Sequence, residues 1–134
     1  MLLEAAHALA LFGQHLLLGV IMATGFVCIY SLITPHKELE LIRSGNAAAA
    51  VGLVGATIGF ALPLSLVLSV TADPVHAGFW GIVVLLTQIL AHLLVRLVVP
   101  RLAKDINEGK MSAGIVQAGA GLVIGMISAA ALTP

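Results

Sequence analysis

Residues 78–99 read GFWGIVVLLTQILAHLLVRLVV, an apolar run in which Arg96 is the single charged side chain. A helix needs about 20 predominantly apolar residues to cross the roughly 30 Å hydrocarbon core of a bilayer. Similar runs lie at about 8–33, 47–70 and 112–131. Backbone groups in lipid must pair internally, and these runs lack strand-like alternation, so we expect an all-α membrane protein with four transmembrane helices.

The composition agrees with a membrane-embedded chain. Of 134 residues, 60% are hydrophobic and 9% are charged, with a mean hydropathy of +1.15, whereas soluble domains are about 25% charged. The net charge is zero, which argues against nucleic acid as a partner. No nucleophile stands beside a base, and no cofactor or metal-binding motif appears. We therefore expect a lipid-embedded protein that is not an enzyme and holds no cofactor or metal.

The positive charges indicate the orientation. They follow the first apolar run and surround the end of the third, which places both groups on one predicted side of the membrane. The positive-inside rule makes these two basic loops cytoplasmic and both termini external, for a multi-pass, N-out/C-out protein. The basic residues are Lys37, Arg43, Arg96, Arg101, Lys104 and Lys110.

The sequence divides into two similar halves, residues 1–70 and residues 71–134. A shift of 65 or 66 positions places Pro35 on Pro100, and later Gly55 on Gly121. Each half has a long helix, a proline that opens a short charged segment, a turn and a Gly-rich helix. Two helices return the chain to its starting side, so we predict tandem parallel repeats related by an axis along the membrane normal.

Small residues recur in the second helix of each predicted repeat. The pairs Gly55-x-x-x-Gly59 and Gly121-x-x-x-Gly125 allow a neighbouring backbone to approach closely. We expect these faces to pack within the protomer or between protomers, with exposure to lipid as the alternative. Four short helices enclose little volume, so we also predict a homo-oligomer, most simply a dimer.

A polar stripe crosses the third helix. Gln88, His92 and Arg96 recur at every fourth position, and they share one face because a helix turns 100° per residue. Arg96 lies near the helix end, so we expect it to snorkel to the lipid headgroups. Gln88 and His92 reach neither surface and must face inward, either in an interhelical hydrogen bond or along a hydrated path or binding site.

Two further positions in the apolar runs are candidates. His15, on the outer part of the first helix, is the fourth member of the predicted polar track. The repeat register places it about 16 Å further outward than His92, which excludes one haem between them and leaves only a haem between the His92 side chains of two protomers. Pro63 interrupts the second helix and frees the carbonyl of Gly59, which predicts either a packing kink or a hinge whose loose carbonyl meets a cation.

The cytoplasmic loops are candidate lids, partner surfaces or inert connectors. Thr34 and Pro35 can cap a short amphipathic helix, which we expect to present Leu39 and Ile42 to the membrane interface and its charged side chains to water. The candidate loop residues are Pro35, His36, Lys37, Glu38, Glu40, Arg43, Pro100, Arg101 and Lys104.

The motifs Tyr30-Ser31-Leu32-Ile33-Thr34-Pro35-His36 and Leu62-Pro63-Leu64, together with Asn46-Ala47-Ala48-Ala49, resemble the YjfL-type bacterial inner-membrane proteins. This family is known as domain of unknown function 350. The resemblance spans nearly the whole chain and implies the bacterial inner membrane and two tandem copies of a two-helix unit. It implies no activity and no functional residue.

Two functions fit these observations. The favoured one is an oligomeric ion or small-solute channel or transporter, with Gln88 and His92 lining the path, Arg96 at its cytoplasmic mouth and Pro63 permitting motion. The alternative is a non-transporting scaffold or envelope-stress protein that recruits a cytoplasmic or membrane partner through loops 34–45 and 100–111. The apparent lack of an intramembrane Asp or Glu counts against transport.

Overall fold

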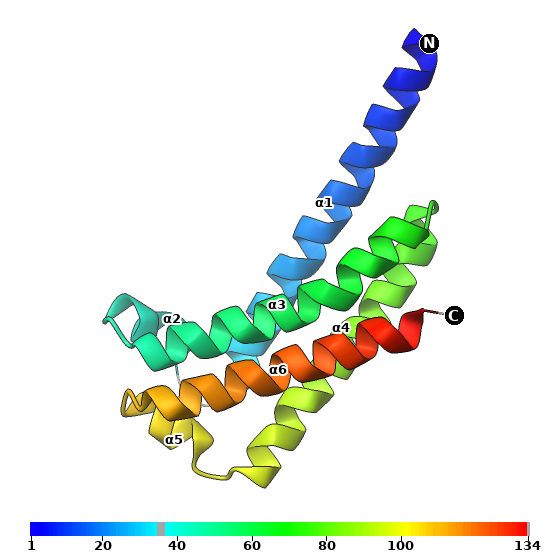
Figure 1. Ribbon diagram of the computed structural model, residues 1–134. Helices are drawn as coiled ribbons and strands as arrows, with labels where there is room; N and C mark the ends of the chain where they lie inside the picture. Colours follow the sequence, from blue (N-terminus) through cyan, green and yellow to red (C-terminus); the bar gives the residue numbers. More distant parts are fainter. Residues whose placement is uncertain (35–36, 134) are drawn as a thin grey trace.

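The computed structural model describes residues 1–34 and 37–133, and over these residues it contains six α-helices. Among them, four are long and apolar enough to cross a membrane, which confirms the all-helical, four-span expectation. The short helices lie together at one end of the bundle (Figure 1). The bounds are α1 (Leu2–Ile33), α2 (Glu38–Arg43), α3 (Ala47–Val70), α4 (Pro74–Val98), α5 (Leu102–Asn107) and α6 (Met111–Leu132).

Two of the long helices begin earlier than hydropathy indicates. We expected the first helix to begin near residue 8 and the third near residue 78, but α1 begins at Leu2 and α4 at Pro74. Glu4 falls in the first turn of α1, where a carboxylate is favourable. The start of α4 is fixed by Asp73, whose carboxylate accepts hydrogen bonds from the amides of Val75 and His76.

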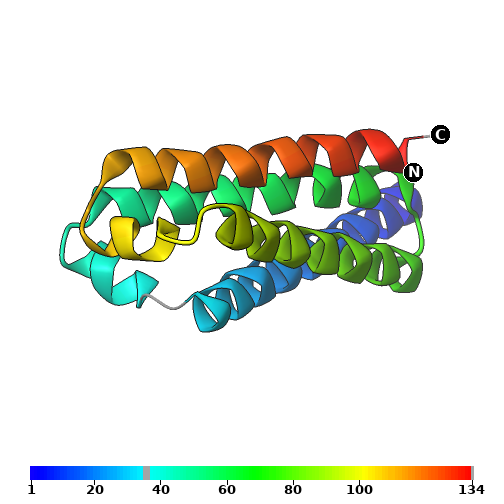
Figure 2. The same ribbon diagram turned by 90° about the horizontal axis from the view of Figure 1, so that it is seen from below.

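Helices α3 and α6 run side by side in the same direction and form the tightest contact of the bundle (Figures 1 and 2). Their glycines leave no room for a side chain: a Cβ added at Gly55 would lie 2.2 Å from the Cβ of Ala118. A Cβ at Gly125 would lie 2.1 Å from the carbonyl oxygen of Gly59, and one at Gly121 would lie 3.1 Å from the Cα of Ala56. The Gly faces therefore pack against each other inside one protomer rather than face lipid.

The short helices α2 and α5 lie at one end of the bundle, which we call the basic end because its connections carry Lys37, Arg43, Arg101, Lys104 and Lys110 (Figure 2). Each short helix is followed by a glycine with positive φ, +90° at Gly45 and +77° at Gly109. Asn46 then caps α3: its side chain accepts a hydrogen bond from the amide of Ala49 and donates one to the carbonyl of Ile106. The Asn46 side chain thus joins the start of α3 to α5.

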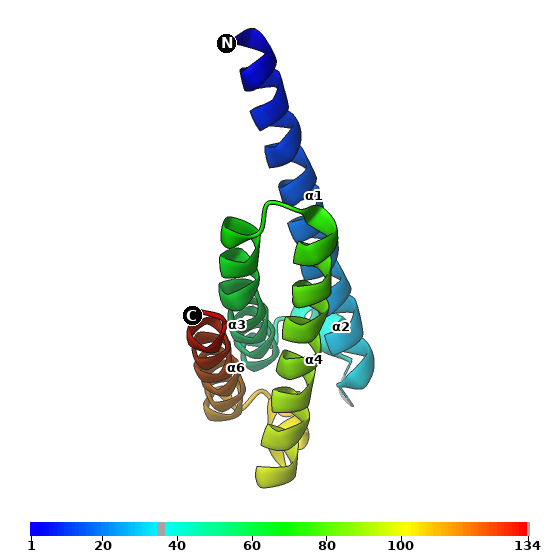
Figure 3. The ribbon, with the colours of Figure 1, turned by 90° about the vertical axis from the view of Figure 1, so that its right-hand side faces the viewer.

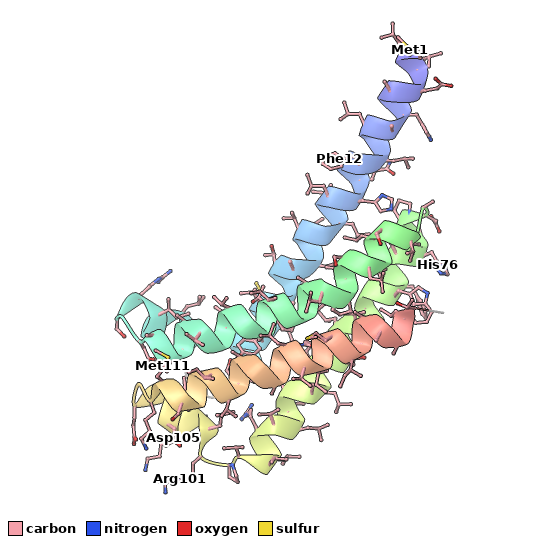
Figure 4. All side chains as sticks on the ribbon, viewed as in Figure 1. Met1, Phe12, His76, Arg101, Asp105 and Met111 are labelled. Carbon is pink, nitrogen blue, oxygen red and sulfur yellow. The ribbon has the colours of Figure 1, made fainter. Side chains whose placement is uncertain are left out.

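Helix α1 contacts the bundle mainly through its second half (Figures 1 and 3). There Phe26 and Tyr30 are buried, and the Phe26 ring stacks on Phe60 of α3 with ring centroids 4.7 Å apart. The first half of α1 leans away from the other helices, with Met1 and Phe12 projecting from it (Figure 4). Phe12 is 62% exposed, so this half of α1 is open to lipid or to a second protein chain.

Candidate functional site

The polar stripe of α4 faces the interior of the bundle. Gln88 and His92 are 3% and 8% exposed, respectively. Gln88 Nε2 donates a hydrogen bond of 2.9 Å to the carbonyl of Gly121 on α6. Gly59 makes this contact possible, because a Cβ at that position would lie 2.6 Å from Gln88 Nε2. The Gln88 side chain and the glycine faces of α3 and α6 together hold α3, α4 and α6 in register.

A second buried amide, Gln117 on α6, lies beside the stripe. It is 3% exposed, and with Gln88 and His92 it lines a cavity of about 10 Å³. We did not single out Gln117 from the sequence. The available signal was that it lies four residues, one helical turn, before Gly121 and so shares the face of α6 that packs against α3.

Closer to the basic end, a buried aromatic residue joins α1 to α4. Tyr30 is fully buried, and its ring lies against the His92 imidazole with ring centroids 4.6 Å apart. Its hydroxyl adjoins the Glu38 carboxylate and lies within electrostatic range of Arg96. Tyr30 therefore connects the polar stripe to the short helix α2.

The structure corrects the prediction for Glu38. We expected this side chain to face water with the rest of α2, but it is 1% exposed. Because α2 begins at Glu38 directly beside the end of α1, its first side chain points into the bundle, where Glu38 Oε2 lies 3.3 Å from Thr34 Oγ1 and shares that hydroxyl with the carbonyl of Tyr30, which is 2.5 Å away. A carboxylate is thus buried in the protein at the basic end, outside the four candidate membrane spans.

Arg96 has a protein partner that the sequence did not predict. Its guanidinium Nη1 donates a hydrogen bond of 2.7 Å to the carbonyl of Ile33 at the end of α1. The last carbonyls of a helix lack intrahelical partners and carry partial negative charge, which attracts a cation. Arg96 thus binds α1 to α4. We call the following residues the buried polar cluster, in which Arg96 is half-buried and the others are buried: Gln88, His92, Tyr30, Thr34, Glu38, Arg96 and Gln117.

His15 does not belong to this cluster, although we predicted it in the polar track. It lies toward the opposite end of the bundle, where its Nε2 is 2.7 Å from the carbonyl oxygen of Thr71 and its Nδ1 is 2.9 Å from that of Leu11. Its contact links α1 to the residue that follows α3.

Pro63 lies buried within α3, which runs through it without a break. The carbonyl oxygen of Gly59, which Pro63 leaves without its helical donor, packs against Gly125 of α6. The hydroxyl of Ser65 donates to the carbonyl of Leu62, not to that of Gly59. The Gly59 carbonyl is therefore covered by protein, and the hypothesis that it meets a permeant cation is wrong.

The remaining loop residues are exposed at the basic end, where Arg101 and Asp105 are labelled in Figure 4. Lys110 Nζ lies 2.9 Å from Asp105 Oδ1 and 3.2 Å from Glu108 Oε2. The hydrogen bond from Lys110 lowers the pKa of Asp105, and the same contact raises the pKa of Lys110. Lys37, Glu40, Arg43, Pro100, Arg101 and Lys104 are exposed as expected, while Pro35 and His36 lie outside the described residues.

The cavity size limits what the cluster can hold. A volume of about 10 Å³ is close to the minimum for one water molecule and far below that of a haem or an organic solute. His92 faces this cavity and Tyr30, so it cannot share a haem with the His92 of a second protomer. A larger open pocket of about 590 Å³ lies at the opposite end, beside Asp73, His76 and Trp80.

Comparison with known proteins identifies relatives along the whole chain. The model of a family described as Domain of Unknown Function (DUF350) matches residues 3–132. The UPF0719 inner membrane protein YjfL of Escherichia coli strain K12 is 35% identical over 127 residues, which cover 94% of this chain and 96% of the relative. The protein of the same name from Escherichia coli O157:H7 gives the same values. No solved structure matches the chain.

Proposed function

The chain belongs to the DUF350 family and is an integral protein of the inner membrane, and from that premise we propose that it is an ion transporter whose buried polar cluster carries protons. The observation that carries this proposal is the burial of Glu38, at 1% exposure, beside Thr34 and Tyr30. Ionisable groups inside membrane proteins are costly and commonly mark ion or proton pathways.

The arrangement of the cluster supports a relay. Glu38 and Arg96 lie at the basic end, Tyr30 and His92 follow toward the interior, and Gln88 lies near the middle of α4. The Glu38 carboxyl, the Tyr30 hydroxyl and the His92 imidazole can exchange protons, while the Arg96 guanidinium stays charged and the Gln88 amide serves only as a hydrogen-bonding group. A proton needs no continuous pore, so the small cavity of about 10 Å³ suits a proton better than a hydrated ion or a solute.

The proposed topology places the basic end in the cytoplasm and both termini outside, by the positive-inside rule. We also propose that the two halves are tandem repeats. The similar glycine turns at Gly45 and Gly109 support this, as does the parallel pairing of α3 with α6. In this arrangement the end of the buried polar cluster that holds Glu38 and Arg96 lies nearest the cytoplasmic side.

We further propose a homo-oligomer, with a dimer as the simplest form. Its support is the first half of α1, where Leu9 is 69% exposed and Phe12 is 62% exposed. Another copy of this apolar half-helix is a suitable partner, because close packing between helices is the main source of association in lipid. A transport path for anything larger than a proton would have to run between protomers. Enzymatic catalysis is not part of this proposal.

A scaffold that recruits a protein partner at the basic end is the second candidate function. Leu39 favours it, because this apolar side chain is 50% exposed on α2 among charged neighbours. A partner that co-purifies in stoichiometric amount, and is lost when residues 36–43 are rewritten, would support the scaffold.

Proton flux into liposomes tests the transport proposal. Purified protein is reconstituted around a pH-sensitive dye, and a pH step between 5 and 8 is applied with potassium and valinomycin to balance charge. We expect faster dye response than in empty vesicles and a slower response when Gln88→Leu and His92→Leu are combined. A flux equal to that of empty vesicles across this range, with folding intact, would exclude transport of protons.

A further inference from the structure

Two buried amide groups face the same small cavity with an unmatched atom each. Within the described chain, Gln88 Oε1 and Gln117 Nε2 are buried and make no hydrogen bond. Both residues are 3% exposed, and both line the cavity of about 10 Å³ between α4 and α6. Buried polar groups are almost always hydrogen-bonded, so two unmatched atoms at one cavity call for a shared partner.

The helix register places these groups close to one another. Gln88 of α4 is bonded to the carbonyl of Gly121 of α6, which sets these two positions at the same level. Helices α4 and α6 run in opposite directions, so one turn further along α4 meets one turn earlier on α6. His92 is therefore level with Gln117, and both lie one turn from Gln88 on the side of the basic end.

We propose that a single water molecule is bound in this cavity and bridges Gln88 and Gln117. It donates one hydrogen to Gln88 Oε1 and accepts a hydrogen bond from Gln117 Nε2. If the Gln117 amide is turned over, the water donates its second hydrogen to the oxygen that then faces it. Either orientation gives the water two polar partners, with the His92 ring in the same cavity wall.

The chemistry of the cavity selects water over a metal ion. Its other lining residues include Phe26, Ala56 and Ala91, which supply no oxygen ligand. Calcium takes six or more oxygen ligands, and magnesium needs an octahedral set, which one amide oxygen and one carbonyl cannot provide. A volume of about 10 Å³ matches the roughly 10–15 Å³ that one water requires.

This inference does not depend on transport, because the unmatched atoms need a partner in any function. If the chain does carry protons, the water extends the buried polar cluster from His92 to Gln88. A negative flux experiment would therefore not contradict the water site. Likewise, a cavity without water would not contradict a positive flux experiment.

The direct test is NMR of the purified full chain with ¹⁵N-labelled glutamine side chains in detergent micelles or nanodiscs. We expect magnetisation transfer from a long-lived water to the side-chain amides of Gln88 and Gln117, and none of comparable lifetime at Gln14, which is exposed on α1. Absence of this transfer at both buried amides would overturn the proposal. The measurement uses the unmodified protein, so it does not depend on the folding of a variant.

A double-mutant cycle gives a second reading. Gln88→Met and Gln117→Met keep the side-chain length and remove the amides, and Gln14→Met is the matched exposed control. Each buried change should lower the unfolding temperature, and the double variant should lose less than the sum of the two, since the bridging water leaves with the first amide. Strictly additive losses would contradict a shared water.

Discussion

Arg96 shows how a charge in an apolar helix finds a partner in a neighbouring helix. Its guanidinium donates a hydrogen bond to the carbonyl of Ile33, which closes the end of α1 and brings positive charge near Tyr30. A hydrogen bond that involves a charged group contributes about 1.5–3 kcal/mol to the free energy of unfolding. The contact therefore stabilises the junction of α1 with α4.

Replacement of Arg96 tests this assignment. Arg96→Met keeps the aliphatic stem but removes the guanidinium, and we expect it to lower the free energy of unfolding by about 2 kcal/mol. Arg101→Met is the control because Arg101 is exposed, and its change should stay within about 0.5 kcal/mol. Chemical unfolding in detergent measures both. Equal stability of the two variants would mean that Arg96 is only a membrane-surface anchor.

The pair of Asp105 and Lys110 makes a prediction about pH. Because the pKa of Asp105 is lowered in the folded protein, its contribution to stability is present above the ordinary range of an aspartate and is lost as the pH falls through the lowered pKa. An NMR titration of the Asp105 carboxyl should therefore give a midpoint below that range, and Lys110→Met should raise it. Lys37→Met, in the other loop, should leave the midpoint unchanged; a Lys110→Met midpoint that does not move would refute the pairing.

At the residue scale, the sequence predicted which way a side chain faces better than it predicted which residues that side chain contacts. Gln88 and His92 were expected inward because neither can reach a membrane surface, and burial confirms it. Glu38 was misplaced because its burial depends on how α2 docks beside Thr34, a tertiary contact that charge patterning does not contain. Gln117 was overlooked because a single amide in a Gly-rich run has no periodic partner.

At the element scale, the pairing of α3 with α6 depends on glycine. A Cβ added at Gly125 would lie only 2.1 Å from the carbonyl oxygen of Gly59, so the two backbones are in direct contact. Close approach of this kind increases dispersion contacts, which matter most in lipid because apolar surfaces gain little from leaving it. The small-residue spacing predicted a close contact, and the structure identifies its partner as the other Gly-rich helix of the same chain.

A single methyl group tests this pairing. Gly125→Ala would force α3 and α6 apart, and we expect a loss of about 1–3 kcal/mol in the free energy of unfolding, as for other overpacked cores. Gly119→Ala on the same helix is the control, since nothing lies within 4 Å of a Cβ there. Unfolding in mixed micelles measures both variants. A Gly125→Ala protein as stable as Gly119→Ala would show that the helices are not held this closely.

Element boundaries were predicted less well than element number. Hydropathy identified all four spans, because each contains a long run of apolar side chains. It placed the starts of α1 and α4 too late. Helix α1 already includes polar residues such as Glu4 and His7, and α4 begins directly after its N-cap, Asp73. Capping is local hydrogen bonding, which an averaged hydropathy does not measure.

At the scale of the whole molecule, the chain is asymmetric. Helices α3, α4 and α6 pack together, while α1 leaves the bundle in its first half (Figure 3). The 32 residues of α1 extend about 48 Å at 1.5 Å per residue, which exceeds the roughly 30 Å hydrocarbon core. Helix α1 must therefore tilt or project from the membrane, and its exposed apolar half gives a surface for a second copy.

The central claim is that the buried polar cluster carries protons, and Glu38 and Glu40 allow it to be tested within one short helix. Glu38 is buried, whereas Glu40, two residues later, is exposed in an ion pair with Lys37 at 3.6 Å. Glu38→Gln and Glu40→Gln remove the same titrating group, so proton flux into liposomes compares them directly. We predict that Glu38→Gln reduces the flux to near that of empty vesicles and that Glu40→Gln retains the wild-type flux. Wild-type flux in a folded Glu38→Gln protein would contradict the account.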